Sequence, residues 1–213
     1  MTIEEDSAAL PRPPRARRKE ARPGEIIDAA VALFAERGYG ATRLEDVARR
    51  AGVAKGTLFV YFPTKEALFR AVARSILSTN LNGIAHVATD PERSFSELIP
   101  TLLAQAAANG EGQPPVIMRL LIAESRTFPD LARVWHDEVV SKVLALVTGA
   151  IERAQARGEV RAGDPRLHAF SILGPMLAGM LYRQIFAGID ETPPDLRALA
   201  ALHGETLVNK LKP

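Results

Sequence analysis

Apolar residues recur every three or four positions along most of the chain, which is the spacing of one face of an α-helix. The first such stripe contains Ile26, Leu33 and Phe34 and ends at Gly38. Later stripes, separated by glycines, prolines and capping residues, predict eight more helices, and no segment alternates as a strand does. These eight are expected at about 42–51, 54–62, 64–81, 93–108, 115–126, 129–157, 165–186 and 193–211.

Composition agrees with this pattern. The 213 residues include 34 alanines and 24 leucines but only 12 aromatic residues, so we expect an all-α fold with about nine helices. The absence of cysteine excludes disulfides, thiolate metal sites and cysteine nucleophiles. The sequence also lacks the common hydrolase, nucleotide-binding and metalloprotease motifs, so we predict no catalytic residue, no cofactor and no enzyme activity.

Charge is distributed unevenly behind a net value of +2. Residues 1–11 carry −3, residues 12–74 carry +7, and residues 75–213 carry −2. A basic N-terminal third beside a nearly neutral remainder indicates a polyanion partner for that third.

The N-terminal segment combines four prolines with six basic residues between Pro11 and Pro23. Such a composition buries no core, so residues 1–22 are predicted to form a flexible basic arm. The arm is either a solvated tail or a contact along phosphates or in a minor groove, and the composition fits both. A secretory signal and a membrane-spanning apolar run are not recognisable, so we expect a cytoplasmic location. The basic side chains of the arm include Arg15, Arg17, Arg18, Lys19 and Arg22.

The segment from Leu44 to Phe62 has the pattern of a helix-turn-helix, two short helices separated by Gly52. Thr42 and Glu45 form the motif T-x-x-E, which predicts a capping box with Thr42 as the N-cap. The second helix carries a cation, a hydroxyl, a bare glycine and aromatic edges, a combination suited to the major groove of DNA. Small residues stand near the expected crossing: Ala48, Ala51 and Ala54.

Residues 26–69 contain three consecutive motifs: A-x-x-L-F-x-x-x-G-Y, then T-x-x-x-x-V-A-x-x-A-G-V, then K-G-T-L-F-V-Y-F-P-x-K-E-x-L. With these motifs the segment resembles the DNA-binding domain of the tetracycline-repressor (TetR) family of bacterial transcription regulators. The stretch RLLIAESRTFPDLARVW is similar to the AefR-like C-terminal subgroup of that family. The resemblance implies a DNA-binding domain at residues 23–68, with the helix-turn-helix at about 43–62, followed by a ligand-sensing and dimerisation domain at 69–213.

The resemblance also implies which side chains face DNA. Phe59 stands where the family often has tyrosine, so a hydroxyl contact is lost there and Val60 offers none. Thr42 and Lys65 match phosphate contacts, although as single residues they also suit plain capping and surface roles. The residues expected at the DNA are Thr42, Arg43, Lys55, Gly56, Thr57, Phe59, Tyr61 and Lys65.

The remaining helices are expected to bind an effector and a second copy of the chain. The helices within residues 165–211 are strongly apolar, and the family resemblance implies that they form the homodimer interface that presents two recognition helices to a palindromic operator on double-stranded DNA. A largely apolar, unidentified small molecule is expected between the helices, although each residue here is equally suited to a filled core. The pocket candidates are Met118, Leu121, Ile122, Trp135, Val139, Phe170, Leu173 and Met176.

Two alternatives to a ligand-responsive regulator stay open from the residues alone. The regulator could work without a small-molecule effector, and the helix-turn-helix could be retained by an enzyme or structural protein.

The four histidines, His86, His136, His168 and His203, include no pair at helical i, i+4 spacing, so they are interpreted as ordinary side chains and no metal site is predicted. His136, Asp137 and Glu138 are interpreted together as a solvated shoulder of a long helix.

Overall fold

The computed structural model describes residues 15–90, 93–112 and 116–211, and within these ranges all regular structure is helical, as predicted. Three consecutive elements, α7, η1 and α8, follow one another without interruption and together match one predicted helix, so the described helices correspond to the nine expected. Their bounds are α1 (Arg15–Ala41), α2 (Leu44–Arg50), α3 (Lys55–Tyr61), α4 (Lys65–Thr89), α5 (Phe95–Gly112), α6 (Val116–Glu124), α7 (Pro129–Trp135), the π-helix η1 (His136–Val140), α8 (Ser141–Ala156), α9 (Pro165–Ile185) and α10 (Leu196–Lys210).

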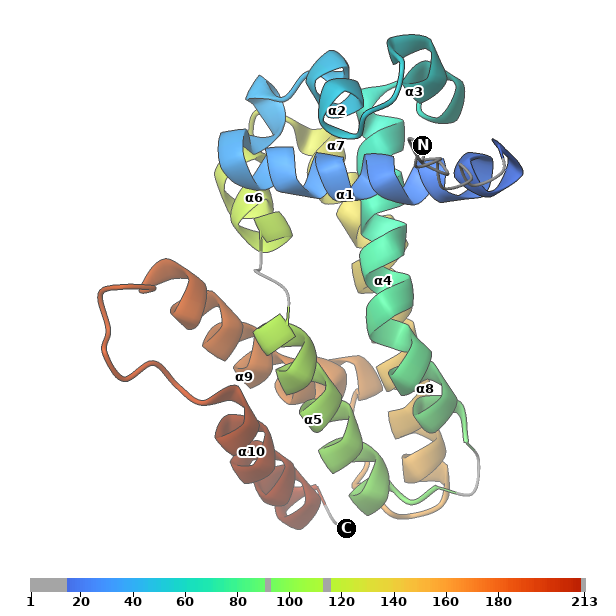
Figure 1. The fold of residues 1–213 in the computed structure, drawn as a ribbon. Coiled ribbons are helices and arrows are strands. Elements are labelled where there is room, and N and C mark those ends of the chain that lie inside the picture. Colours follow the sequence, from blue (N-terminus) through green and yellow to red (C-terminus); the bar gives the residue numbers. More distant parts are fainter. Residues whose placement is uncertain (1–14, 91–92, 113–115, 212–213) are drawn as a thin grey trace, which may run out of the picture.

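The helices form two packed groups joined by one long helix (Figure 1). We call α1 to α3 the head and α5 to α10 the body. Helix α4 starts beside the head and runs down into the body, where α5, α8, α9 and α10 pack together. Helices α6 and α7 belong to the body in sequence but lie against α1 and α4 at the level of the head.

The upper hydrophobic core is shared between the head and the body. Phe34 of α1, Leu58 of α3 and Phe69 of α4 are almost completely buried, and Leu131 and Val134 of α7 pack into the same cluster. The rings of Phe34 and Phe69 lie edge to face with centroids 6.2 Å apart. The expected division of the chain at residues 68 and 69 is therefore not a boundary between separate cores.

The lower core is formed by α5, α8, α9 and α10. Its largest fully buried side chains include Ile99, Leu103, Ile151, Ile172 and Leu196. Ile99 and Leu103 are four residues apart on α5, the spacing of one face of a helix, so this helix turns an apolar face towards the lower core. In the described ranges no helix is both long and apolar enough to cross a membrane.

Several helix ends follow from local capping. Thr64 caps α4 by accepting a hydrogen bond from the amide of Ala67 at 3.0 Å. Asp164 caps α9 in the same way, with Pro165 at the first helical position. Gly38 breaks α1 with a φ of 81°, a conformation that favours glycine, so the predicted end of the first stripe is confirmed.

Two helices are longer than the sequence predicted. Helix α4 continues to Thr89 instead of ending near residue 81. Helix α1 begins at Arg15, inside the segment expected to be a flexible arm, and Pro23 lies within it. The expectation was based on a composition that buries no core, but alanine, arginine, lysine and glutamate all favour helix, and this propensity does not require a core. Residues 1–14 of the expected arm lie outside the described residues.

Candidate DNA-binding interface

Helices α2 and α3 form the helix-turn-helix that the sequence predicted. Gly52 makes the turn with a φ of 65°, and a side chain there would be strained. Val47 and Ala48 of α2 and Leu58 of α3 are buried against α1 and α4, which holds the two short helices at a fixed angle. Of the small residues expected at the crossing, Ala48 is buried and Ala51 half-buried, whereas Ala54 is exposed.

The outer face of α3 is open to solvent. Val60 is 81% exposed and Phe59 37% exposed, although both are apolar. Gly56 has no atom within 4 Å of where a β-carbon would stand, so another molecule can approach its backbone closely. Lys55 is exposed and Thr57 and Tyr61 are half-buried, so α3 brings all five expected recognition residues onto one short helix.

Lys55 is already paired inside the protein. Its ammonium group lies 2.8 Å from a carboxylate oxygen of Glu45 on α2 and 5.7 Å from the ring centre of Phe59. The hydrogen bond from Lys55 lowers the pKa of the Glu45 carboxyl group. Both side chains remain substantially exposed, so the pair is weak and the ammonium group can exchange partners.

The prediction for Thr42 is wrong in its local geometry. The N-cap of α2 is Arg43, which is exposed at the start of that helix, and no side chain caps it. Thr42 is only 1% exposed, and its hydroxyl donates to the carbonyl oxygen of Gly38 at 2.7 Å. The T-x-x-E motif therefore does not form a capping box, because the break at Gly38 turns the threonine inward, away from a possible phosphate.

Lys65 is likewise occupied inside the protein. Its ammonium group donates to the carbonyl oxygens of Tyr39, Gly40 and Thr42 at 2.8, 3.2 and 3.0 Å. The same group lies 4.4 Å from the ring centre of Tyr39. Partial burial lowers the pKa of Lys65. The three donors of the ammonium group are thus directed at the backbone of residues 39–42, between the break of α1 at Gly38 and the start of α2. A phosphate contact by Lys65 would require one of these donors to change its partner.

Glu124, at the end of α6, is a residue that the sequence analysis missed. Its two carboxylate oxygens accept hydrogen bonds from the backbone amides of Tyr39 and Gly40 at 2.8 and 2.7 Å. Arg119 on the same helix donates to the carbonyl oxygen of Ala35 at 3.0 Å. The sequence contained only an indirect signal for this contact. Two closely spaced glycines, at 38 and 40, are typical of a backbone segment that another group approaches closely.

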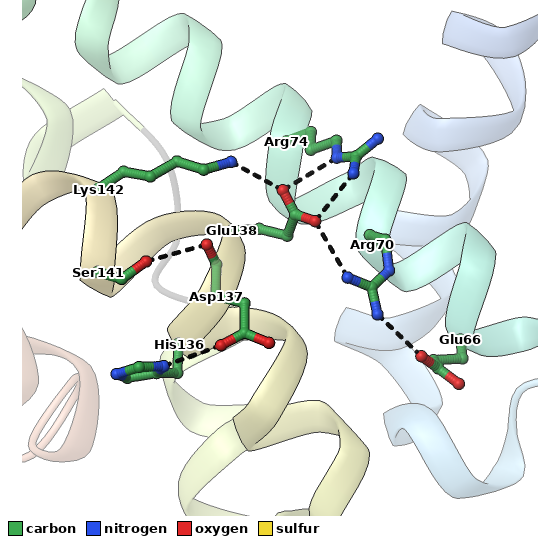
Figure 2. A network of polar contacts seen from close by, with 8 residues as sticks. All are labelled: Glu66, Arg70, Arg74, His136, Asp137, Glu138, Ser141 and Lys142. Carbon is green, nitrogen blue, oxygen red and sulfur yellow. Dashed lines mark hydrogen bonds and ion pairs between the residues drawn. The ribbon is translucent and has the colours of Figure 1, made fainter.

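Glu138 is the second residue that was missed, and its placement contradicts the expected solvated shoulder (Figure 2). The side chain is 5% exposed and lies in η1, facing α4. Its carboxylate accepts two hydrogen bonds from Arg74 at 3.0 Å, one from Arg70 at 3.1 Å and one from Lys142 at 2.9 Å. These cations lower its pKa to about 2. Asp137 and His136, by contrast, point away from this cluster and remain exposed.

The position of Glu138 in the apolar pattern offered a signal for its burial. It follows Leu131 by seven residues and Val134 by four, so it falls on the buried stripe of the same helix. The π-turn adds one residue to the local turn of the helix, and such insertions redirect the side chains around them.

The expected pocket residues are divided between the two cores and the surface of the molecule. Leu121 packs into the upper core and Met176 into the lower core, while Ile122 and Phe170 are 59% and 52% exposed. The hollows between α8 and α9, between α5 and α10 and beside α4 contain none of the eight. The physical reason is that these residues lie on different faces of their helices. The others are half-buried: Met118, Trp135, Val139 and Leu173.

Metal ligation has no visible site in the part of the chain that the structure describes. No group of three or more His, Asp or Glu side chains comes together there.

Glu138 should make the stability of the protein depend on pH. Its pKa in the folded chain is about 2, below the ordinary value of 4.5, so its stabilising contribution is complete above about pH 4.5 and is lost as the pH falls towards 2. Glu138→Gln should lower the free energy of unfolding by about 1–3 kcal/mol near pH 7, and the deficit should shrink in acid. Urea unfolding of both proteins at about pH 7 and about pH 3 measures this.

Asp137→Asn is the matched control, because the Asp137 side chain is next to Glu138 in sequence but 53% exposed. Its only ion-pair partner within the described residues is His136. It should change the free energy of unfolding by less than about 0.5 kcal/mol. A deficit in Glu138→Gln that is the same at both pH values would contradict the role assigned to the carboxylate.

Comparison with protein families gives two matches at family level. Residues 26–72 match the model of bacterial regulatory proteins of the tetR family. Residues 115–203 match the AefR-like transcriptional repressor C-terminal domain. The first segment contains most of the head and the start of α4, and the second contains most of the body. Both resemblances stated from the motifs are thereby confirmed.

Individual relatives are also transcriptional regulators rather than enzymes. The HTH-type transcriptional regulator RutR of Escherichia coli (strain K12) is 34% identical over 127 residues, which cover 60% of this chain but only about half, 52%, of RutR. The fatty acid metabolism regulator protein of Bacillus subtilis (strain 168) is 29% identical over 163 residues, covering 73% of this chain and 81% of that protein.

Solved structures share the fold. A TetR-family transcriptional regulator from Mesorhizobium loti has a TM-score of 0.73 and 28% identity, covering 92% of this chain and 98% of its own. FadR from Bacillus subtilis, solved with stearoyl-CoA, has a TM-score of 0.72 with 23% identity, covering 88% of this chain and 98% of its own, and supports the fold alone. With matching family models for its DNA-binding head and for its body, the chain belongs to the TetR family of bacterial transcriptional regulators.

Proposed function

We propose that this protein is a sequence-specific DNA-binding regulator that acts as a homodimer on a palindromic operator and represses transcription until a small-molecule effector releases it. The observation that carries the proposal is the outer face of α3. A helix that leaves Phe59 and Val60 exposed on a basic head, beside a bare glycine at 56, is suited to enter a major groove.

Base readout is assigned to the first turns of α3. Lys55 can donate to guanine, Thr57 to several bases, and Phe59 can contact a thymine methyl group. Arg43 stands exposed at the N-terminus of α2, where a phosphate is favoured. Binding requires that Lys55 leave Glu45, an exchange that costs little because the pair is exposed.

The dimer interface is assigned to α9 and α10. Large apolar side chains on the outer face of α9 recur at helical spacing, with the small residues Gly174 and Ala178 between them. A continuous apolar face of this kind marks an interaction site, and a second copy of the same face is its self-complementary partner. The exposed apolar residues are Leu167, Phe170, Leu177, Tyr182 and Ile185 on α9 and Leu202 on α10.

We assign the small-molecule effector to the apolar compounds. Among the described residues, no charged side chain is buried in the lower core. A relative of 29% identity is named a fatty acid metabolism regulator. Fatty-acyl compounds are therefore the first class to test, and the eight pocket residues predicted from the sequence remain the candidates for mutation.

Selection of binding sites from random duplex DNA tests the function directly. The purified protein should enrich one palindromic sequence, and footprinting near physiological salt should protect both half-sites. Addition of acyl-CoA thioesters of increasing chain length should then release the duplex. Enrichment of no sequence would overturn the proposal, whereas enrichment without release by any small molecule would favour a regulator that has no such effector.

Lys55 and Lys65 should behave differently on the selected duplex. Lys55→Met should reduce the ratio of specific to non-specific affinity by about tenfold, because a base contact is lost. Lys65→Met should lower the free energy of unfolding by about 1–3 kcal/mol, because three carbonyl oxygens lose their donor. Since Lys65 neutralises no phosphate in this conformation, the dependence of affinity on salt should keep its slope. A slope reduced by about one unit would return Lys65 to the phosphate role.

Leu177→Glu should separate the dimer. A carboxylate in the middle of the α9 face would be buried without a partner on association, and we expect a monomer of unchanged helix content. Sedimentation and circular dichroism measure both properties. Val60→Glu, which introduces the same charge at an exposed position in the head, should stay dimeric. A dimeric Leu177→Glu protein would place the interface elsewhere.

A further inference from the structure

The backbone of residues 39–42, between the break of α1 at Gly38 and the start of α2, is held from two sides by opposite charges. Glu124 accepts the amide hydrogens of Tyr39 and Gly40, at 2.8 and 2.7 Å. Lys65 donates to the carbonyl oxygens of the same two residues and of Thr42. The anion and the cation thus bind the same short stretch of backbone, and each hydrogen bond is strengthened by a full charge.

The backbone at Gly38 and Gly40 has no room for a side chain beside the Glu124 carboxylate. A β-carbon on Gly38 would stand 2.4 Å from a carboxylate oxygen of Glu124, and Gly38 also has a φ of 81°. A β-carbon on Gly40 would stand 3.2 Å from the other oxygen and 3.1 Å from the ring of Phe128. Glycine at both positions is therefore matched to a carboxylate that arrives from a helix 84 residues away in sequence.

The contact links the body to the part of the head that leads directly into DNA recognition. Glu124 ends α6, and α2 begins at Leu44, two residues after the stretch that Glu124 and Lys65 hold. Arg119 attaches the same helix to the carbonyl oxygen of Ala35 in α1. Any movement of α6 relative to α4 must therefore either carry the start of α2 with it or break these hydrogen bonds.

We propose that Glu124 is a positioning residue that fixes the orientation of the helix-turn-helix relative to the body. In the dimer, this orientation sets the separation of the two α3 helices and hence the half-site spacing that the protein accepts. The inference rests on the proposed function, because spacing has meaning only for a dimer on a palindrome. Glu124 acts through the backbone of Tyr39 and Gly40 and lies on α6, not on the exposed face of α3.

Glu124→Gln tests the proposal with a side chain of the same shape. The amide group keeps one acceptor but presents an NH2 group to the second backbone amide, so one hydrogen bond is replaced by a repulsive contact. The probes are the palindrome selected by the unmodified protein, the same duplex with one base pair inserted at its centre, and a random duplex. The insertion rotates one half-site by about 35° and moves it by about 3.4 Å.

The unmodified protein should bind the selected palindrome at least about tenfold more tightly than the inserted duplex. Glu124→Gln should bind these two duplexes within about threefold of each other, while its affinity for the random duplex stays unchanged because no phosphate contact is altered. Glu152→Gln is the control, since this exposed carboxylate of α8 lies in the body and should leave the spacing preference intact.

Gly40→Ala is an independent second variant. It leaves Glu124 charged but fills the space that the carboxylate and Phe128 occupy, and it should relax the spacing preference in the same direction. A purely stabilising role would lower thermal stability without moving the preference, so an unchanged preference in folded Glu124→Gln or Gly40→Ala would overturn the proposal. An equal loss of affinity for all three duplexes would overturn it too. If the unmodified protein selects no sequence, the proposed function fails and this inference fails with it.

Discussion

The need to satisfy the backbone between α1 and α2 governs the arrangement of the head. Gly38 breaks α1, so the following peptide groups lose their helical partners and must find others. Lys65 from α4 supplies donors to the carbonyl oxygens, and Glu124 from α6 supplies acceptors to the amides. Because both partners come from other helices, the start of α2 is placed by tertiary contacts, and α3 follows from α2.

Helix α4 extends this dependence to the whole molecule. Its first half supplies Phe69 to the upper core and Arg70 and Arg74 to the carboxylate of Glu138, while its C-terminal part lies along the body. A buried carboxylate that lost these cations would remain unpaired, so η1 and α4 are expected to move together. The head shares one core with α4, α6 and α7, and Glu124 and Arg119 of α6 bind its backbone. These contacts are the physical basis on which a change in the body could reach the DNA-binding surface.

Local structure was largely predictable, and two failures have different physical causes. The helices and the turn at Gly52 depend on residues that are close in sequence, and these expectations agree with the structure. The caps at Thr64 and Asp164 are equally local. The capping role of Thr42 and the solvated position of Glu138 were wrong. Glu138 has its decisive partners, Arg70 and Arg74, in another helix, and no pattern of spacing within one helix contains that information. Thr42 instead donates to Gly38, four residues earlier, because the break at Gly38 turns its side chain inward.

The sequence by itself determined the helical class, the helix-turn-helix and its exposed recognition residues, because apolar periodicity, turn glycines and motif spacing are local properties of the chain. Only the tertiary structure decided that Lys65 faces the backbone of residues 39–42 and that Glu124 meets it from the opposite side. It also decided that the upper core incorporates α6 and α7 from the body. Charged side chains take the partners that packing brings within about 3 Å, and that proximity exists only once distant helices have come together.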